Sequence, residues 1–465
     1  MPKLINLILS KNFIVFSLIA YAISISIQYN LKIPSTLTEG DALSYIDFSF
    51  DNIEIIFTQH RTFGLPLLIN LFEFFSPKFY YWGYFNLILF LFSVYVLYFA
   101  LVKTGFHKIL ASSTIYGILL TYNLYYYFDF INTDIAGLSF FLLSISNFLL
   151  FVHLDKKINL FLFSILIFFC IFIRPSYILS VPCFLFYFYR LNTNIFEKKN
   201  IMKYVQYLFI SNILIIFYIL LRLFYAGNLG LVSFSGVLSS NHLTFLAEPD
   251  QLQNISIENR DFIKQLINRR NNVEGECNIS YREAKINNID INDHRSICYN
   301  DHLMSAWLEK IKLNLNLEPF PSDDPKNYSA WKYKGLSEFF NIKDNVEIDN
   351  QLKSATKEVI YKNKKEYLNI VLESLFKQSF IKYMLAIKYL IIIFIFGYFL
   401  LYTYKNTYVL DTKTKAFFEF NLIHYITLSL LTSFMNFPEE RFFIAQSILL
   451  LPSTFFYFGH LFLKK

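Results

Sequence analysis

The chain has 465 residues, of which 55% are hydrophobic, 20% aromatic and only 17% charged, and its mean hydropathy is +0.39. One soluble core cannot hide this much apolar surface, so the composition excludes a cytosolic enzyme and a nucleic-acid-binding protein. What the formal net charge of +7 indicates about partners depends on where the lysines and arginines lie. The class that remains is a membrane protein.

Long apolar segments predict an all-α polytopic membrane protein with about ten transmembrane helices, because roughly 20 helical residues cross a bilayer core about 30 Å thick. The predicted spans are 12–29, 79–102, 109–128, 135–153, 158–173, 176–189, 205–225, 384–404, 416–435 and 442–463. The fifth and sixth spans flank Arg174-Pro175. We expect them to form a hairpin, because basic residues flank the pair on both sides. The lysines of the short loops favour a cytoplasmic N-terminus, with the first span retained rather than cleaved as a signal peptide.

This pattern divides the chain into three regions. Residues 1–225 form a first transmembrane region, in which 30–78 is a long outer loop, and residues 381–465 form a second one. Between them, 226–380 has nearly balanced charge and many asparagines, which predicts a soluble extracytoplasmic domain between the seventh and eighth spans. Near 356–381 we expect an amphipathic helix that lies on the membrane. The expected location is a multi-pass protein of the bacterial inner membrane, with its active site on the outer face.

The four cysteines occur in two different environments. Cys170 and Cys183 fall in apolar spans and are expected in the protein core. Cys277 and Cys298 fall in the polar region, where an oxidising compartment would permit a disulfide. Two free thiols are the alternative.

Charged residues gather in the predicted outer loops, where a charge close to lipid is costly and needs a reason. Arginine rather than lysine stands at several span junctions, and a guanidinium group suits bidentate binding of phosphate. The loops therefore predict a phosphate-bearing ligand at the outer interface, and solvated or snorkelling charges are the alternative. The polar residues of these loops include Glu39, Asp41, Tyr45, His60, Arg61, Asp134, Arg174, Glu440 and Arg441.

Five short motifs follow one another along the chain: Gly40-Asp41-Ala42-Leu43-Ser44-Tyr45, Arg61-x-x-Gly64-x-Pro66, Thr133-Asp134, Arg174-Pro175-Ser176 and Glu440-Arg441. In this order they resemble the GT-C superfamily of polytopic glycosyltransferases. The similar branch contains dolichyl-phosphate-mannose protein mannosyltransferases and bacterial transferases that use polyprenyl-phosphate sugars. The resemblance covers about 10–190 and 435–445. The arginine loop keeps only the glycine and the second proline of the family's Arg-x-Pro-Gly-Tyr-Pro pattern.

The resemblance implies a sugar transfer from a polyprenyl-phosphate donor to an acceptor hydroxyl by direct displacement. The acceptor would be a glycan, a lipid or a protein, and membrane lipids would be the other partners. Asp41 would be the general base, and Asp134 would orient the acceptor or the base. Glu39 beside Asp41 would hold a divalent cation if the reaction needs one, so no metal is assigned. The other implied site residues are Arg61, Arg174 and Arg441 for the donor phosphate, and Tyr45, His60 and Glu440 for the acceptor groove.

Two other functions remain open at this point. A polysaccharide polymerase or O-antigen ligase-like enzyme would also handle polyprenyl-linked sugars, but its essential residues would lie in the large outer domain. A secondary transporter would place ionisable residues near the bilayer midplane, often within inverted repeats. The charges here lie at the predicted outer interface instead.

Overall fold

The computed structural model describes residues 7, 9–29, 31–32, 34, 42–46, 48–59, 61–119, 127–191, 198–227, 229–232, 235–272, 278–289, 345–376, 412–435 and 449. All regular elements within these ranges are helices.

Four helices in the described part are long and apolar enough to cross a bilayer. They are α2 (Lys11–Gln28), α6 (Trp82–Lys103), α8 (Thr133–Leu154) and the Val205–Ala226 part of α11 (Lys198–Ala226). A rise of 1.5 Å per residue gives such helices a length of about 30 Å, which matches the hydrocarbon core. They coincide with the first, second, fourth and seventh predicted spans.

Four further helices cover other predicted spans wholly or in part: α7 (Lys108–Leu119), α9 (Lys157–Ile173), α10 (Ser180–Leu191) and α21 (Thr412–Met435). The eighth predicted span lies outside the described residues, and of the tenth only Leu449 is described. The total of ten spans therefore stays a prediction.

Helix α8 is the centre of the bundle. It packs between α6 and α9, and its side chains are buried along most of its length. Helix α2 instead leaves Phe16, Ile19 and Ile27 exposed on one face, as expected for a helix whose outer face meets lipid. Cys170 and Cys183 are buried, which confirms their predicted place in the core.

The chain changes direction at Arg174-Pro175, between α9 and α10. Between them lies the single-turn helix η3 (Pro175–Leu179). The rings of Phe163 on α9 and Phe184 on α10 have centroids 5.1 Å apart, although the two residues stand more than two helical turns on either side of the break. One continuous helix would hold these rings far apart, so the chain turns back here, as the predicted hairpin requires. That both arms cross a membrane from the same side stays a prediction.

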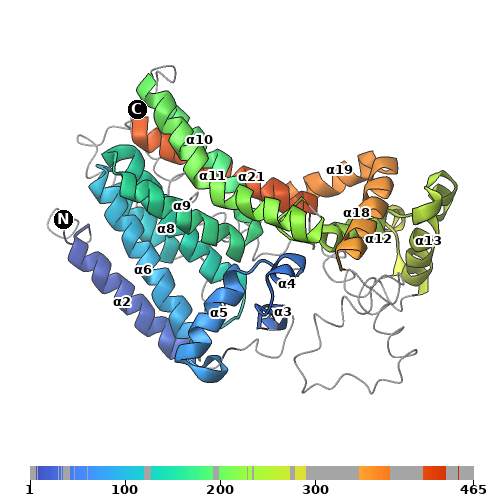
Figure 1. Cartoon of the computed structure of the whole chain (residues 1–465), viewed down its shortest axis with the longest axis horizontal. Coiled ribbons are helices and arrows are strands. Elements are labelled where there is room, and N and C mark those ends of the chain that lie inside the picture. Colours follow the sequence, from blue (N-terminus) through green and yellow to red (C-terminus); the bar gives the residue numbers. More distant parts are fainter. Residues whose placement is uncertain are drawn as a thin grey trace.

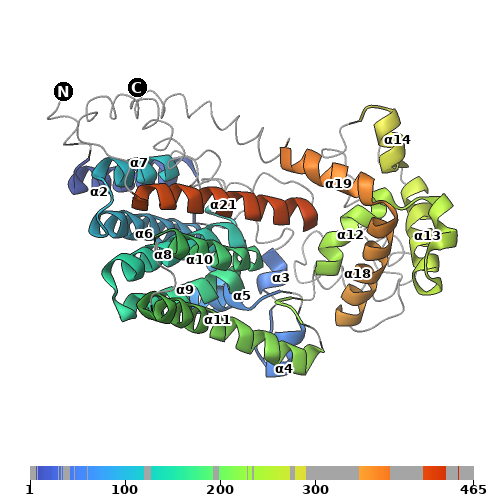
Figure 2. The ribbon, with the colours of Figure 1, turned by 90° about the horizontal axis from the view of Figure 1, so that it is seen from above.

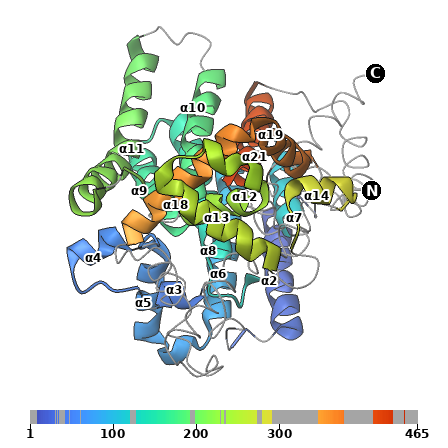
Figure 3. The same cartoon turned by 90° about the vertical axis from the view of Figure 1, so that its right-hand side faces the viewer.

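Short helices cover one end of the bundle. They are α3 (Ala42–Ile46), α4 (Ile53–Thr58), α5 (Gly64–Phe75) and η1 (Pro77–Phe79), and Figures 1 and 3 show α3, α4 and α5 side by side. Gln59 closes the loop around α4, because its Nε2 donates to the carbonyl oxygen of Ser49 at 2.8 Å. A small core, here called the end core, joins α3, α5 and η1 to α6, α8 and α9. Its buried members are Ala42, Tyr45, Leu65, Ile69, Phe79, Trp82, Ile131, Ala136 and Ile173.

A second group of helices, here called the helical subdomain, lies beyond one end of the long helices, where α21 reaches it (Figures 1 and 2). It has its own apolar core, in which Leu243, Ile263 and Leu352 are buried. Its elements are α12 (Ser235–Leu246), η4 (Pro249–Asn254), α13 (Ile257–Asn272), α14 (Tyr281–Ile286), α18 (Asn345–Lys362) and α19 (Lys364–Glu373).

The expected membrane-lying helix near 356–381 is wrong as far as Glu373. The chain breaks at Asn363 between α18 and α19, and Val359 and Ile370 are buried in the core of the helical subdomain. An apolar stripe at helical spacing suits a protein core as well as a membrane surface. In this chain the stripe faces protein.

Candidate active site

The end of the bundle brings together two charged residues from different helices. Asp134 lies in the first turn of α8 and Arg174 follows the last residue of α9, and each is 8% exposed. Nη1 of Arg174 donates to Oδ1 of Asp134 in an ion pair. Two predicted site residues that are 40 positions apart in the sequence are therefore in direct contact.

Local sequence explains why each residue of the pair stands where it does. Asn132 caps α8, since its Oδ1 accepts the backbone N–H of Asp134 at 3.0 Å, and a carboxylate in the first turn is favoured by the helix dipole. Pro175 forces its predecessor out of the helical region. Arg174 accordingly has φ −138° and ψ 99° and ends α9.

Gly137 lets the stem of Arg174 lie against α8. A Cβ added to this glycine would be 3.2 Å from Cβ of Arg174 and 3.4 Å from the ring of Tyr177. Gly137 is three residues after Asp134, so it faces the same side of α8. The small residue therefore creates the place that the arginine occupies.

The loop with Arg61 reaches the pair through Gly64. A Cβ added at Gly64 would lie 2.4 Å from the carbonyl carbon of Phe172 and 2.6 Å from the nitrogen of Ile173. The first turn of α5 therefore packs directly on the backbone just before Arg174. Consecutive Cα atoms are about 3.8 Å apart, so Arg61, three residues before Gly64, cannot be far from this end of α9.

Arg61 also contacts α3. Its Cζ lies 4.7 Å from the centroid of the Tyr45 ring, which is a cation–π distance. Tyr45 is buried in the end core together with Ala136 and Ile173, which flank the ion pair in the sequence. The structure thus gathers four of the predicted site residues, Tyr45, Arg61, Asp134 and Arg174, around one small core.

Three further polar atoms, two of them on residues that neighbour the pair and one on α6, are buried and have no hydrogen-bond partner among the described residues. They are Oδ1 of Asn86, Nδ2 of Asn132 and the hydroxyl of Tyr177. Nδ2 of Asn86 donates to the carbonyl oxygen of Phe128 at 2.8 Å, so Asn86 holds the segment that leads into α8. Buried polar groups without a protein partner are rare and suit water or a polar ligand. The sequence analysis missed Asn86 and Tyr177, although an asparagine inside an apolar span could have drawn attention to α6.

The other predicted site residues lie outside the described residues: Glu39, Asp41, His60, Glu440 and Arg441. The predicted cysteine pair also lies outside them. Among the residues that the structure describes, no three His, Cys, Asp or Glu side chains gather closely enough to hold a metal ion. The cation that Glu39 and Asp41 would bind stays a prediction.

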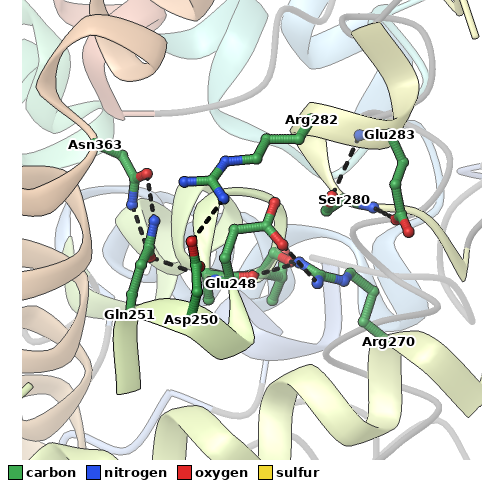
Figure 4. Close-up of polar contacts among 10 residues, drawn as sticks. Glu248, Asp250, Gln251, Arg270, Ser280, Arg282, Glu283 and Asn363 are labelled. Carbon is green, nitrogen blue, oxygen red and sulfur yellow. Dashed lines mark hydrogen bonds and ion pairs between the residues drawn. The ribbon is translucent and has the colours of Figure 1, made fainter. Parts of the chain in front are cut away.

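A second buried ion pair lies in the helical subdomain (Figure 4). Nη2 of Arg270 is 3.8 Å from Oε2 of Glu248, and Nη1 donates to the carbonyl oxygens of Thr244 and Ala247 at 3.0 and 2.7 Å. These carbonyls belong to the C-terminal end of α12, so Arg270 satisfies groups that the helix itself leaves unpaired. Burial raises the pKa of the Glu248 carboxyl, against the opposing effects of a Ser280 hydrogen bond and the Arg270 charge. This pair serves as a helix cap.

The surroundings of Arg270 are also tied together by polar contacts that Figure 4 displays. Gln251 and Asn363 exchange two hydrogen bonds, at 2.6 and 3.0 Å. Arg282 donates to Asp250 at 2.9 Å on the exposed side of the cluster. These contacts join η4 to α14 and to the residue between α18 and α19, so they stabilise the packing of the subdomain.

No family model, no curated protein and no solved structure matches this chain. Within its described ranges the chain is helical, and its apolar helices are long enough to cross a membrane. The function proposed below therefore rests on the geometry of the site.

Proposed function

We propose that the protein is a membrane glycosyltransferase of the GT-C type, which moves a sugar from a polyprenyl-phosphate donor to an acceptor hydroxyl on the extracytoplasmic face. The observation that carries this proposal is the buried Asp134–Arg174 pair, against which Gly64 packs the loop of Arg61. A buried guanidinium at a helix end, with a second arginine close by, is a fitting place for a phosphate.

The physical chemistry of the donor supports this location. Each buried CH2 of a prenyl chain contributes about 0.8 kcal/mol, so the chain stays in lipid and its phosphate stays at the interface. The end core brings α3 and α5 together with the ends of α8 and α9. Phosphate accepts two parallel hydrogen bonds from a guanidinium group, so it is able to share Arg174 with Asp134.

The proposed reaction exchanges one bond for another at the anomeric carbon of the sugar. The acceptor oxygen forms the new bond, its proton passes to Asp41, and the bond to the phosphate oxygen breaks with its electron pair. Arg61 and Arg174 stabilise the charge on the departing polyprenyl phosphate. Asp41 is proposed as the base from the sequence, and its neighbour in the chain, Ala42, is buried in the end core.

Reconstitution tests this function. The purified chain in nanodiscs is given a panel of polyprenyl-phosphate hexoses and pentoses with candidate acceptors, and the products are identified by mass spectrometry. Asp41→Asn should reduce transfer by about 100- to 10,000-fold, the usual contribution of a positioned general base. Asp51→Asn is the matched control, because Asp51 is an exposed carboxylate of the same predicted loop and should leave transfer unchanged.

Two outcomes would contradict the proposal. If Asp41→Asn keeps activity within about threefold of the wild type, Asp41 is not the general base, since such a base contributes at least about 100-fold. Absence of sugar transfer from every donor of the panel, with every substrate shown to reach the nanodiscs, would contradict the proposed glycosyltransferase function.

A further inference from the structure

His424 is a buried polar residue in the middle of α21. It is 2% exposed, and its Nε2 forms a 2.8 Å hydrogen bond with Oγ of Ser180, which is 0% exposed. Polar groups inside an apolar bundle are costly and are retained where they have a partner or a function. The proposed reaction does not use His424, so its position needs a separate reason.

Ser180 ends the same short turn that Arg174 begins. The single-turn helix η3 runs from Pro175 to Leu179, with Arg174 as the residue before it and Ser180 as the residue after it. A 3-10 turn of this length has few hydrogen bonds of its own. The bond from His424 therefore fixes the far end of the turn that carries the arginine.

A stack of three rings supports the same turn from the side. The Tyr177 ring lies on Phe141 with centroids 4.8 Å apart, and Phe141 lies on His424 with centroids 4.5 Å apart and an interplanar angle of 13°. Phe141 belongs to α8, seven residues after Asp134. The stack thus joins α21 to α8, which carries Asp134, and to η3, which directly follows Arg174.

Helix α21 is itself held by the helical subdomain. The carbonyl oxygen of Phe434 accepts hydrogen bonds from Nε2 of His242 and from the hydroxyl of Tyr367, each at 3.0 Å. Phe434 is in the last turn of α21, where carbonyls have no partner within the helix. Figure 2 shows α21 running from the bundle to α12 and α19, which carry these two residues.

We propose that His424 is a positioning residue that orients η3 through its hydrogen bond with Ser180. In this orientation the Arg174 guanidinium faces Asp134 and the donor phosphate. Helix α21, which carries His424, connects this arrangement to the helical subdomain. The inference rests on the proposed function in so far as Arg174 binds the phosphate. The orientation of η3 does not depend on that function.

The test compares Ser180→Ala and His424→Phe with Ser146→Ala in the full-length chain. Ser146 is an equally buried serine whose hydroxyl donates only to Leu142 of its own helix, so it is the matched control. The probe is undecaprenyl phosphate in nanodiscs. The Ser180 and His424 variants should each weaken its binding about 2- to 12-fold, the range that corresponds to one net hydrogen bond, and the double variant should be no weaker than the weaker single one. Ser146→Ala should bind like the wild type.

Two further measurements keep the outcomes separate. In an Arg174→Ala background, Ser180→Ala should cause no additional loss, and a full additional loss would contradict the positioning role. Hydrogen–deuterium exchange at Tyr177–Ser180 should be faster in Ser180→Ala than in Ser146→Ala, and equal exchange would also contradict it. If exchange rises but Arg174→Ala binds undecaprenyl phosphate like the wild type, the positioning role stands and the proposed phosphate site is wrong.

Discussion

The bundle end and the helical subdomain each bury an arginine beside a carboxylate, but they use the pair differently. Nη1 of Arg174 donates to the side-chain carboxylate of Asp134. Buried polar atoms without a hydrogen-bond partner among the described residues occur at both pairs, on Asn132 and Tyr177 beside the first and on Glu248 and Arg270 in the second, so they do not separate the two. Arg270 directs its Nη1 to two backbone carbonyls of α12 and approaches Glu248 only at 3.8 Å. The partners of a buried arginine, rather than its burial, indicate whether it is suited to a ligand or to the fold.

The largest expected effect concerns the structural pair. Arg270→Ala should destabilise the helical subdomain by about 3–5 kcal/mol, because it leaves two carbonyl oxygens of α12 without their donor and the buried Glu248 carboxylate without its cation. Hydrogen–deuterium exchange of α12 and α13 in the full-length chain measures the loss. Arg282→Ala is the control, since its pair with Asp250 is about half exposed and should contribute less than about 1 kcal/mol. Equal effects of Arg270→Ala and Arg282→Ala would show that Arg270 does not cap α12, and would contradict the structural role assigned to the Arg270–Glu248 pair.

A smaller effect is expected where the arginine loop touches the bundle. Gly64→Ala should cost about 1–3 kcal/mol, because the added Cβ meets the backbone of Phe172 and Ile173, which cannot rotate away. Thermal unfolding in detergent measures it. Gly227→Asn is the control: its φ is +63° and nothing lies within 4 Å of an added Cβ, a conformation that asparagine tolerates. An unfolding temperature for Gly64→Ala equal to that of the wild type would contradict the close packing of α5 on α9.

The smallest effect is a pH-dependent one in the helical subdomain. Burial by itself would raise the pKa of the Glu358 carboxyl, but hydrogen bonds from Asn259 and Ser256 outweigh it, so the pKa of Glu358 is lowered. A lowered carboxyl pKa stabilises the fold at neutral pH, and this contribution disappears as the pH falls from about 4.5 through the pKa of the folded state. Glu358→Gln should therefore destabilise the chain by about 1 kcal/mol at pH 7. The difference from the wild type, followed by chemical unfolding, should shrink below pH 4.5; a constant difference would contradict the ionic role.

The sequence predicted the helices of the bundle well, because length and apolar composition decide whether a segment can cross a bilayer. Asp134 and Arg174 were predicted together because each stands at an end of its helix. The roles of Gly64, Gly137 and His424 depend on which helices pack together, and a periodic pattern carries no such information. The stripe with Val359 and Ile370 shows the same limit, since its spacing does not say what covers it.

The affinity of the chain for undecaprenyl phosphate, measured after either of two arginines is removed, tests the phosphate site at Arg174. Arg174 pairs with Asp134 at the end of the bundle where α9 ends. Arg190 lies in the last turn of α10 and pairs with Glu419, with 3.0 Å between Nη2 and Oε1. Arg174→Ala should weaken binding at least about tenfold, as the loss of a charge-assisted hydrogen bond implies, while Arg190→Ala should bind like the wild type. Equal affinities of the two variants would contradict a phosphate site at Arg174.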